Sequence, residues 1–444
     1  MNDPIVALEA DLNSFDLAVR SAALDALLEL AATGKIPLKA ERPIVNLHCH
    51  TFFSFNAYGY SPTGLAWLAK KEGYRGLGIV DFDVLDGVDE FLKACDRAEV
   101  RGTAGIETRV FIPEFGTREI NSPGEPGVCY HMGVGFTSSS VPEAAMPLLN
   151  DLRERAAQRY HEMVERINAH LAPVQVDYER DILPLTPAGN PTERHIVTAY
   201  IQAAERQISP VSGFWANKLG NTTEEIEGLL HKPAAFQNHV RSKLMKKGGV
   251  GYIQPSADTF PSVEVFHRLI SACGGLPCAA WLDGTSEGEQ AIDELLGLLV
   301  KKGVRTFNII PDRNWNIADA SAKQVKVQKL YAVVEAAQRL ALPLNIGTEM
   351  NSFGQRLVDD FDAPELAPIR EAFLAGADVV YGHTVLQRQS DLGYESTWAE
   401  AHFPNREQRN AFYQQVGALY RPGHGAGLKA DLSPEQILQI LEKV

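Results

Sequence analysis

Two histidines separated by one residue, His48 and His50, end an apolar run that begins at Ile44. Alternate residues of a strand project from the same face, so we expect both imidazoles to point the same way. Two imidazoles placed like this can chelate one metal ion. The spacing alone could also come from two unrelated polar residues. The neighbouring segments favour a metal site.

Ionisable side chains also interrupt later apolar runs. Glu107 lies within GIETRVF, His131 within CYHMGVGF and Glu349 within NIGTEMNSFG. A carboxylate in such a run is costly to bury unless it is paired or bound to a metal. For Glu107 the alternative is a salt bridge to an arginine, and for His131 it is a hydrogen-bonded core histidine. Their recurrence at the ends of successive strands favours a metal centre.

These residues fall within a regular alternation of strands and helices. The predicted strands are 44–50, 76–82, 103–111, 128–136, 276–282, 304–310, 344–349 and 378–381. The predicted helices include 5–34, 62–72, 85–98, 262–272, 287–302, 325–340 and 363–375. This alternation predicts an α/β fold with parallel strands, as a barrel or a doubly wound sheet. In such a barrel, the active site lies at the carboxyl ends of the strands.

The alternation is interrupted once. Residues 146–249 contain several long helical patterns and form a predicted helical insertion. The barrel is then built from residues 41–145 and 250–390, with a helical extension at 1–40 and a C-terminal extension at 391–444. Ser433 and Pro434 predict the start of the last helix, as a cap followed by proline at the first helical position.

The composition limits the classes of function. The chain has 444 residues, 45% of them apolar, with a net charge of −14, which argues against a broad grip on polynucleotides. No apolar run is long enough to span a bilayer. The acidic start lacks the basic segment of a signal peptide, and the five cysteines form no CxxC pair. We therefore expect a cytoplasmic protein with reduced thiols.

Four motifs, HCHT, VDFDVLDG, GIE and YHMGVGF, follow one another in the order found in the PHP (polymerase and histidinol phosphatase) superfamily. The chain resembles this family over residues 44–385. NPTERHI, KKGGVGYIQP and SACGGLPCAAWLDG resemble the branch with a helical insertion that dephosphorylates nucleotides and small phosphates. The resemblance implies a distorted (β/α)7-type barrel and a metal-dependent hydrolase.

The chain departs from the family pattern at several ligands. Phe82 stands where the family has a histidine ligand, Trp281 aligns with the histidine of the fifth strand, and Asn351 replaces another ligand. The ligands that can be carried over form one metal site, made of His48, His50, Glu107 and Glu349. His131 completes this site or lies just outside it. We expect one divalent ion, which is zinc, manganese or iron.

Two carboxylates, one arginine and two histidines near these motifs have open roles. Asp81 and Asp83 can accept a proton from a metal-activated water, or can cap a helix or hold a loop. Arg194 and His195 align with the phosphate-contacting residues of the insertion, and a solvated helix face is the alternative. His383 is a further candidate ligand.

Arg313 and Asn314 lie just beyond a predicted strand end, where they can contact the substrate or simply form a turn. The favoured function is a phosphoesterase acting on a small phosphorylated metabolite. One alternative is a metal-dependent hydrolase or lyase with a non-phosphorylated substrate. The other is a degenerate PHP domain that binds a ligand without turnover.

Overall fold

A computed structural model describes residues 3–256, 258–425 and 427–443. Its centre is a seven-stranded, nearly closed barrel in which each strand pairs with its neighbour in the sequence. The strands are β1 (Arg42–Cys49), β2 (Tyr74–Phe82), β3 (Arg101–Phe111), β4 (Val128–Val134), β5 (Leu276–Trp281), β6 (Thr306–Ile309) and β7 (Leu344–Ile346). A parallel bridge between Cys49 and Glu349 joins the end of β1 to the segment after β7. The predicted distorted (β/α)7-type barrel is confirmed.

One strand runs against the others. β4 is antiparallel to both β3 and β5, whereas the remaining pairs are parallel. Between β3 and β4 there is only a short 3-10 turn, Pro113–Phe115, instead of a crossover helix. A parallel return usually runs through a crossover helix, and without one the chain folds back beside β3. The expectation of uniformly parallel strands is wrong for β4.

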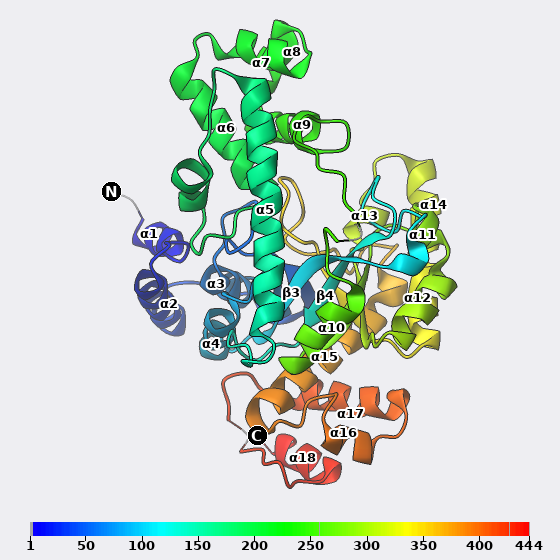
Figure 1. Ribbon diagram of the computed structural model, residues 1–444. Helices are drawn as coiled ribbons and strands as arrows, with labels where there is room; N and C mark the ends of the chain where they lie inside the picture. Colours follow the sequence, from blue (N-terminus) through cyan, green and yellow to red (C-terminus); the bar gives the residue numbers. More distant parts are fainter. Residues whose placement is uncertain (1–2, 257, 426, 444) are drawn as a thin grey trace.

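Helices cover the outside of the barrel (Figure 1). They are α3 (Pro62–Glu72), α4 (Val88–Ala98), α10 (Val263–Ala272), α11 (Glu287–Gln290), α12 (Ile292–Lys301), α13 (Asp312–Trp315), α14 (Ala320–Arg339) and α15 (Arg370–Ser390). The start of α3 shows why they form where predicted: Ser61 accepts a hydrogen bond from the Gly64 amide, and Pro62 occupies the first turn. Residues 378–381, predicted as a strand, lie inside α15.

The helical insertion lies between β4 and β5. It consists of α5 (Met146–Leu171), α6 (Glu193–Gln207), α7 (Val211–Leu219), α8 (Thr223–Leu230) and α9 (Pro233–Met245). These helices bury a core of their own, with Tyr200, Trp215 and Val240 fully enclosed. Figure 1 shows α5 running along the barrel and continuing into this second core, so α5 connects the two parts.

The remaining helices pack at the two ends of the chain. α1 (Pro4–Asp11) and α2 (Leu17–Ala32) replace the single predicted helix 5–34. α16 (Thr397–His402), α17 (Arg406–Leu419) and α18 (Pro434–Leu441) follow α15, and Ser433 forms the predicted cap of α18. Among the described residues, none of the helices combines the length and apolar character needed to cross a membrane.

Candidate metal centre

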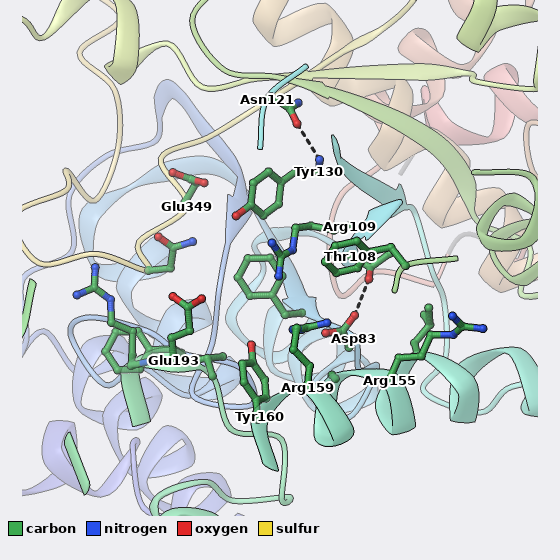
Figure 2. Close-up of a pocket in the computed structure, with 18 of the residues that line it drawn as sticks. Asp83, Thr108, Arg109, Asn121, Tyr130, Arg155, Arg159, Tyr160, Glu193 and Glu349 are labelled. Atoms are coloured by element: carbon green, nitrogen blue, oxygen red, sulfur yellow. Dashed lines mark hydrogen bonds between the residues drawn. The ribbon is translucent and has the colours of Figure 1, made fainter. Parts of the chain in front are cut away.

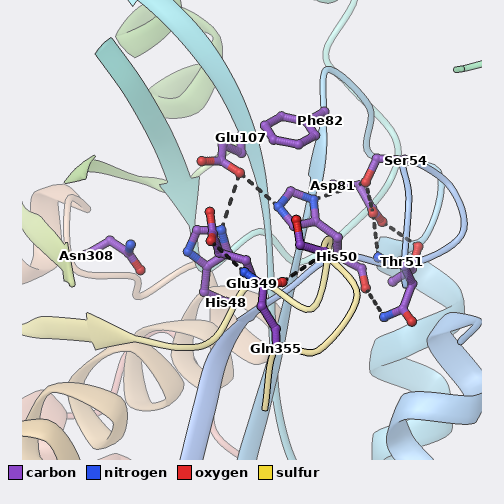
Figure 3. Close-up of polar contacts among 12 residues, drawn as sticks. His48, His50, Thr51, Ser54, Asp81, Phe82, Glu107, Asn308, Glu349 and Gln355 are labelled. Atoms are coloured by element: carbon purple, nitrogen blue, oxygen red, sulfur yellow. Dashed lines mark hydrogen bonds and ion pairs between the residues drawn. The ribbon is translucent and has the colours of Figure 1, made fainter. Parts of the chain in front are cut away.

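His48, His50 and Glu107 meet inside the barrel (Figure 3). His48 lies near the end of β1 and His50 directly follows the strand, and Glu107 faces both from β3. Nε2 of His48 lies 3.3 Å from Oε2 of Glu107, and Nε2 of His50 lies 3.0 Å from the same oxygen. The histidines are completely buried and Glu107 is 2% exposed. Strand alternation thus brings three ligand atoms to one point, as the HxH pattern predicts.

The three groups shift one another's ionisation. Burial disfavours the Glu107 carboxylate, but the two imidazoles outweigh burial and lower its pKa to about 2. Burial also disfavours a charged His48, but the Glu107 carboxylate prevails and raises the pKa of His48 above its usual value. An ionised carboxylate in a buried site requires a cation beside it. The site is therefore built to hold positive charge.

A hydrogen-bond relay fixes the ring of His50. The Ser54 hydroxyl lies 2.6 Å from Oδ1 of Asp81 and 3.1 Å from Nδ1 of His50. Asp81 also accepts hydrogen bonds from the amide and hydroxyl of Thr51. Because the Ser54 hydroxyl donates its one hydrogen to Asp81, it can only accept from His50. Nδ1 of His50 therefore carries a proton, and in the neutral imidazole Nε2 presents a lone pair.

The unpartnered Nε2 of His50 is the feature of the structure that best supports a bound metal ion. Nε2 of His50 is buried and has no hydrogen-bond partner in the described part of the chain, yet it lies against the Glu107 carboxylate. In the neutral imidazole these two atoms are both electron-rich, so they repel unless a metal ion, or a proton on Nε2, lies between them. Two imidazole nitrogens and one carboxylate oxygen form a common donor set for a divalent transition metal, and three protein ligands leave positions open for a substrate.

Glu349 lies beside this cluster with its carboxylate turned elsewhere. Its amide donates to the carbonyl of His48, and its carbonyl accepts from the amide of His50, both at 2.8 Å. Its carboxylate accepts from Arg313 at 2.8 Å and from Gln355 at 3.0 Å. The backbone at Glu349 has φ 65°, a left-handed conformation that non-glycine residues rarely adopt. The structure therefore brings Glu349 to the site but pairs its carboxylate with Arg313.

Two aromatic residues occupy positions where the family has histidines. Phe82 stacks on the imidazole of His50, with ring centroids 4.4 Å apart. Trp281 is fully buried at the end of β5. Neither side chain can ligate a metal, so the donor set stays with the three residues of the cluster.

The structure does not bring His131 to the cluster. His131 pairs with Thr108 on β3, one position from Glu107, and therefore projects from the opposite face. Its Nε2 lies 2.7 Å from Nε2 of His267, which α10 carries on the outside of the barrel. The prediction of His131 as a ligand is therefore wrong, because the register of β4 turns this side chain away from the cluster. His383 is also placed elsewhere, inside α15, where it contacts the Gly135 carbonyl and the Tyr394 amide.

A cavity of about 280 Å³ lies next to the cluster, between the barrel and α5 (Figure 2). Phe82 and Glu349 line it and also contact the histidines. Its cationic lining consists of Arg109, Arg155, Arg159, Arg194, Arg241, Lys246 and Arg313. Its acidic lining consists of Asp83, Glu193 and Glu349. The cavity is thus rich in positive charge although the whole chain carries a net charge of −14.

Of the predicted substrate-binding residues, Arg194 and Arg313 line the cavity. His195 does not: its Nδ1 accepts from the Thr192 amide at 3.0 Å in the capping box of α6, and burial lowers its pKa to about 4. Asn314 does not either, because its amide donates to the carbonyls of Asp283 and Lys326. Both side chains hold local backbone structure.

The two candidate catalytic carboxylates are separated. Asp81 lies behind His50 and holds Ser54, so it positions a ligand instead of facing the cavity. Asp83 lines the cavity and accepts a hydrogen bond of 2.6 Å from Thr108. Burial raises the pKa of Asp83, although the Thr108 hydrogen bond and nearby arginines oppose that effect.

Sequence reasoning missed Ser54, Arg109 and Arg159. Ser54 carries a weak signal, since it follows His50 by four residues in a segment without a helical or strand pattern. Arg159 is one of many charged residues of a long amphipathic helix, and nothing in the pattern of α5 marks the face that meets the barrel. Only the tertiary packing reveals these three residues.

No protein-family model matches the sequence. No curated protein matches it. Among solved structures, an amidohydrolase from Chromobacterium violaceum with bound sulfate and no metal aligns with 74% of this chain and 96% of its own, at 16% identity and a TM-score of 0.47. A protein from Bifidobacterium adolescentis described as a "putative metal-dependent phosphoesterase" aligns over the same shares, at 18% identity and a TM-score of 0.45. The side chains of this protein therefore carry the functional conclusion.

Proposed function

We propose that the protein is a metal-dependent phosphoesterase that acts on a small phosphorylated metabolite. His48, His50 and Glu107 would hold one divalent ion, which is zinc, manganese or iron. Such an ion lowers the pKa of a water molecule and polarises a phosphoryl oxygen. The order of sequence motifs shared with the PHP superfamily supports the same reaction class.

The observation that carries the proposal is the state of Arg194. Its side chain is 5% exposed, and no carboxylate lies within ion-pair distance among the described residues. Asn238 and Ser352 accept hydrogen bonds from its guanidinium and hold it at the cavity wall. Burial and the neighbouring Arg241 lower its pKa to about 10, so it stays charged at neutral pH. A buried, charged guanidinium without an acidic partner matches an anionic ligand.

Other side chains complete the site. Arg159 also lacks a carboxylate partner among the described residues and faces the same cavity. Arginine binds phosphate through paired hydrogen bonds, which fixes its orientation as well as its position. Asp83 is the unpaired carboxylate of the cavity lining, and burial raises its pKa, which makes it a stronger base than an exposed aspartate. The helical insertion, proposed to span residues 146–249, supplies both arginines.

The test is phosphate release from a panel of phosphate monoesters by protein loaded with zinc, manganese or iron(II). Arg194→Ala should raise KM about tenfold or more, with a smaller change in kcat, because it removes binding to the phosphate in ground and transition states alike. Arg206→Ala is the matched control, since Arg206 is exposed on the same helix. No phosphate release with any of the three metals, or equal KM values in both variants, would overturn the proposal.

A further inference from the structure

A second cavity continues from the first. The inner chamber is the cavity of about 280 Å³ beside Phe82 and Glu349, and the outer chamber is a cavity of about 330 Å³ beside Met163 and Tyr252. Seven residues line both chambers, Arg109, Arg159 and Phe260 among them. Each chamber alone is near the lower end of the ~300–1,000 Å³ that small-molecule sites occupy. Together they form an elongated site.

The outer chamber has apolar walls. Met163 on α5 and Met245 at the end of α9 are 3% and 1% exposed, and Ile253 and Pro255 come from the segment that returns to the barrel. Methionine side chains are flexible and polarisable, so they adapt to apolar groups of different shape. This lining differs from the arginine-rich lining of the inner chamber.

The junction of the two chambers is built around Phe260. The guanidinium of Arg109 lies 4.3 Å from the centre of its ring, and that of Arg159 lies 5.2 Å away. Arg109 is neutralised by Glu125 at 2.8 Å, whereas Arg159 has no carboxylate partner in the described part of the chain. A ligand that extends from the inner into the outer chamber therefore passes the guanidinium of Arg159 and then meets the apolar wall of the outer chamber.

Apart from Arg159 at the junction, most charged groups of the outer chamber already have hydrogen-bond partners within the protein. Glu125 accepts hydrogen bonds from Arg109, Ser122 and Tyr252. Lys246 pairs with Glu193, and Lys247 donates to the carbonyl of Gly124. A sugar or a nucleobase in this chamber would have few free groups to pair with and would lose hydrogen bonds to water. An apolar group would lose none.

We infer that the substrate is an amphipathic phosphate monoester, with its phosphate in the inner chamber and an apolar leaving group in the outer chamber. The inference rests on the proposed function for the position of the phosphate. It adds that the alcohol part of the ester is apolar, and that sugar and nucleoside monophosphates are the poorer ligands. Burial of apolar surface in the outer chamber supplies the added affinity.

Calorimetric titration with methyl-, butyl- and octylphosphonate tests this, because phosphonates bind without being hydrolysed. Octylphosphonate should bind about tenfold or more tightly than methylphosphonate, as expected when several methylene groups are buried. Met245→Trp fills the outer chamber and should remove most of this gain while leaving methylphosphonate affinity unchanged. Met146→Trp is the matched control, since Met146 is exposed at the start of α5.

A second variant covers the case in which Met245→Trp does not fold. Tyr252→Ala removes a half-buried wall residue and should reduce the gain of octylphosphonate about threefold. Equal affinity for the three phosphonates, or tighter binding of adenosine monophosphate than of octylphosphonate, would overturn the inference. If octylphosphonate binds with the expected gain but no ester is hydrolysed, the outer chamber stands and the proposed function falls. If phosphate esters are hydrolysed at rates that do not depend on the length of their alkyl group, the proposed function stands and the inference about the outer chamber falls.

Discussion

Nε2 of His50 lies 3.0 Å from Oε2 of Glu107, and Nδ1 of the same ring lies 3.1 Å from the Ser54 hydroxyl. The relay through Ser54 to Asp81 places the ring proton on Nδ1. In the neutral imidazole the two facing atoms then both present electron pairs. This arrangement suits a metal ion between them and gives each of the four residues a distinct part.

The relay can be tested through Ser54. Ser54→Ala removes the group that fixes the ring of His50, and metal affinity should fall about 10- to 100-fold, as for other groups that support a ligand. Ser61→Ala is the matched control, because Ser61 is buried but caps α3. That control should lower thermal stability by about 1 kcal/mol and leave metal affinity unchanged. Equal metal affinity in the two variants would show that the relay has no such role.

Glu107 and Glu349 should differ as ligands. Glu107→Gln removes a donor that faces both histidines, and it should weaken metal binding about 100-fold or more. Glu349→Gln alters a carboxylate that Arg313 and Gln355 hold, and it should change the affinity less than about tenfold. Competition titration with a chromogenic chelator measures both. A larger loss in Glu349→Gln would make Glu349 a principal ligand.

His131 should prove structural. His131→Gln breaks the buried contact with His267 and should lower the free energy of unfolding by about 1–3 kcal/mol, with the metal content unchanged. His161→Gln, on the exposed side of α5, serves as the control and should change stability by less than about 0.5 kcal/mol. Loss of the metal in His131→Gln would contradict the placement of this residue outside the site.

Asp359 should make stability depend on pH. Burial raises its pKa from 3.8 to about 7, with one oxygen accepting from the Trp315 indole at 2.7 Å. A raised carboxyl pKa means that the neutral form is favoured in the folded state. Stability from this group is therefore complete below about pH 4 and is lost as the pH rises to 7. Each unit of pKa corresponds to about 1.4 kcal/mol.

Asp359→Asn removes that titration. The difference in free energy of unfolding between the variant and the unmodified protein should shift in favour of the variant when the pH is raised from 4.5 to 8. Urea denaturation at both pH values measures this difference. Asp360→Asn, at the exposed neighbouring position, should show no such gain. If the difference in free energy of unfolding between Asp359→Asn and the unmodified protein is the same at both pH values, Asp359 does not titrate in this range.

The sequence was most informative where one strand decides the geometry. The HxH spacing needs only the alternation of β1, and Glu107 lies in the middle of an apolar strand, so the cluster was predictable. The positions of the seven strands and of the helical insertion also followed from periodic patterns, although the pattern added an eighth strand and the seven-stranded barrel came from the family resemblance. The helix at residues 378–381 was missed because a short apolar run does not distinguish a strand from a buried helix.

The errors arise from features that depend on tertiary structure. The register of β4 against β3 decides which face His131 projects from, and no local pattern in the sequence fixes that register. Arg194 and His195 are adjacent in α6, yet one faces the cavity and the other caps the helix. The outer chamber combines α5, the end of α9 and the segment after it, and no local pattern predicts that they meet.

The central claim is a single metal ion held by His48, His50 and Glu107, and elemental analysis tests it most directly. Protein purified without chelators or added metal should contain about one zinc, manganese or iron ion per chain. His48→Ala and Glu107→Gln should lose that ion, and His131→Gln should keep it. Protein that contains no metal and takes up none of the three, or a Glu107→Gln variant with its metal content unchanged, would contradict the account.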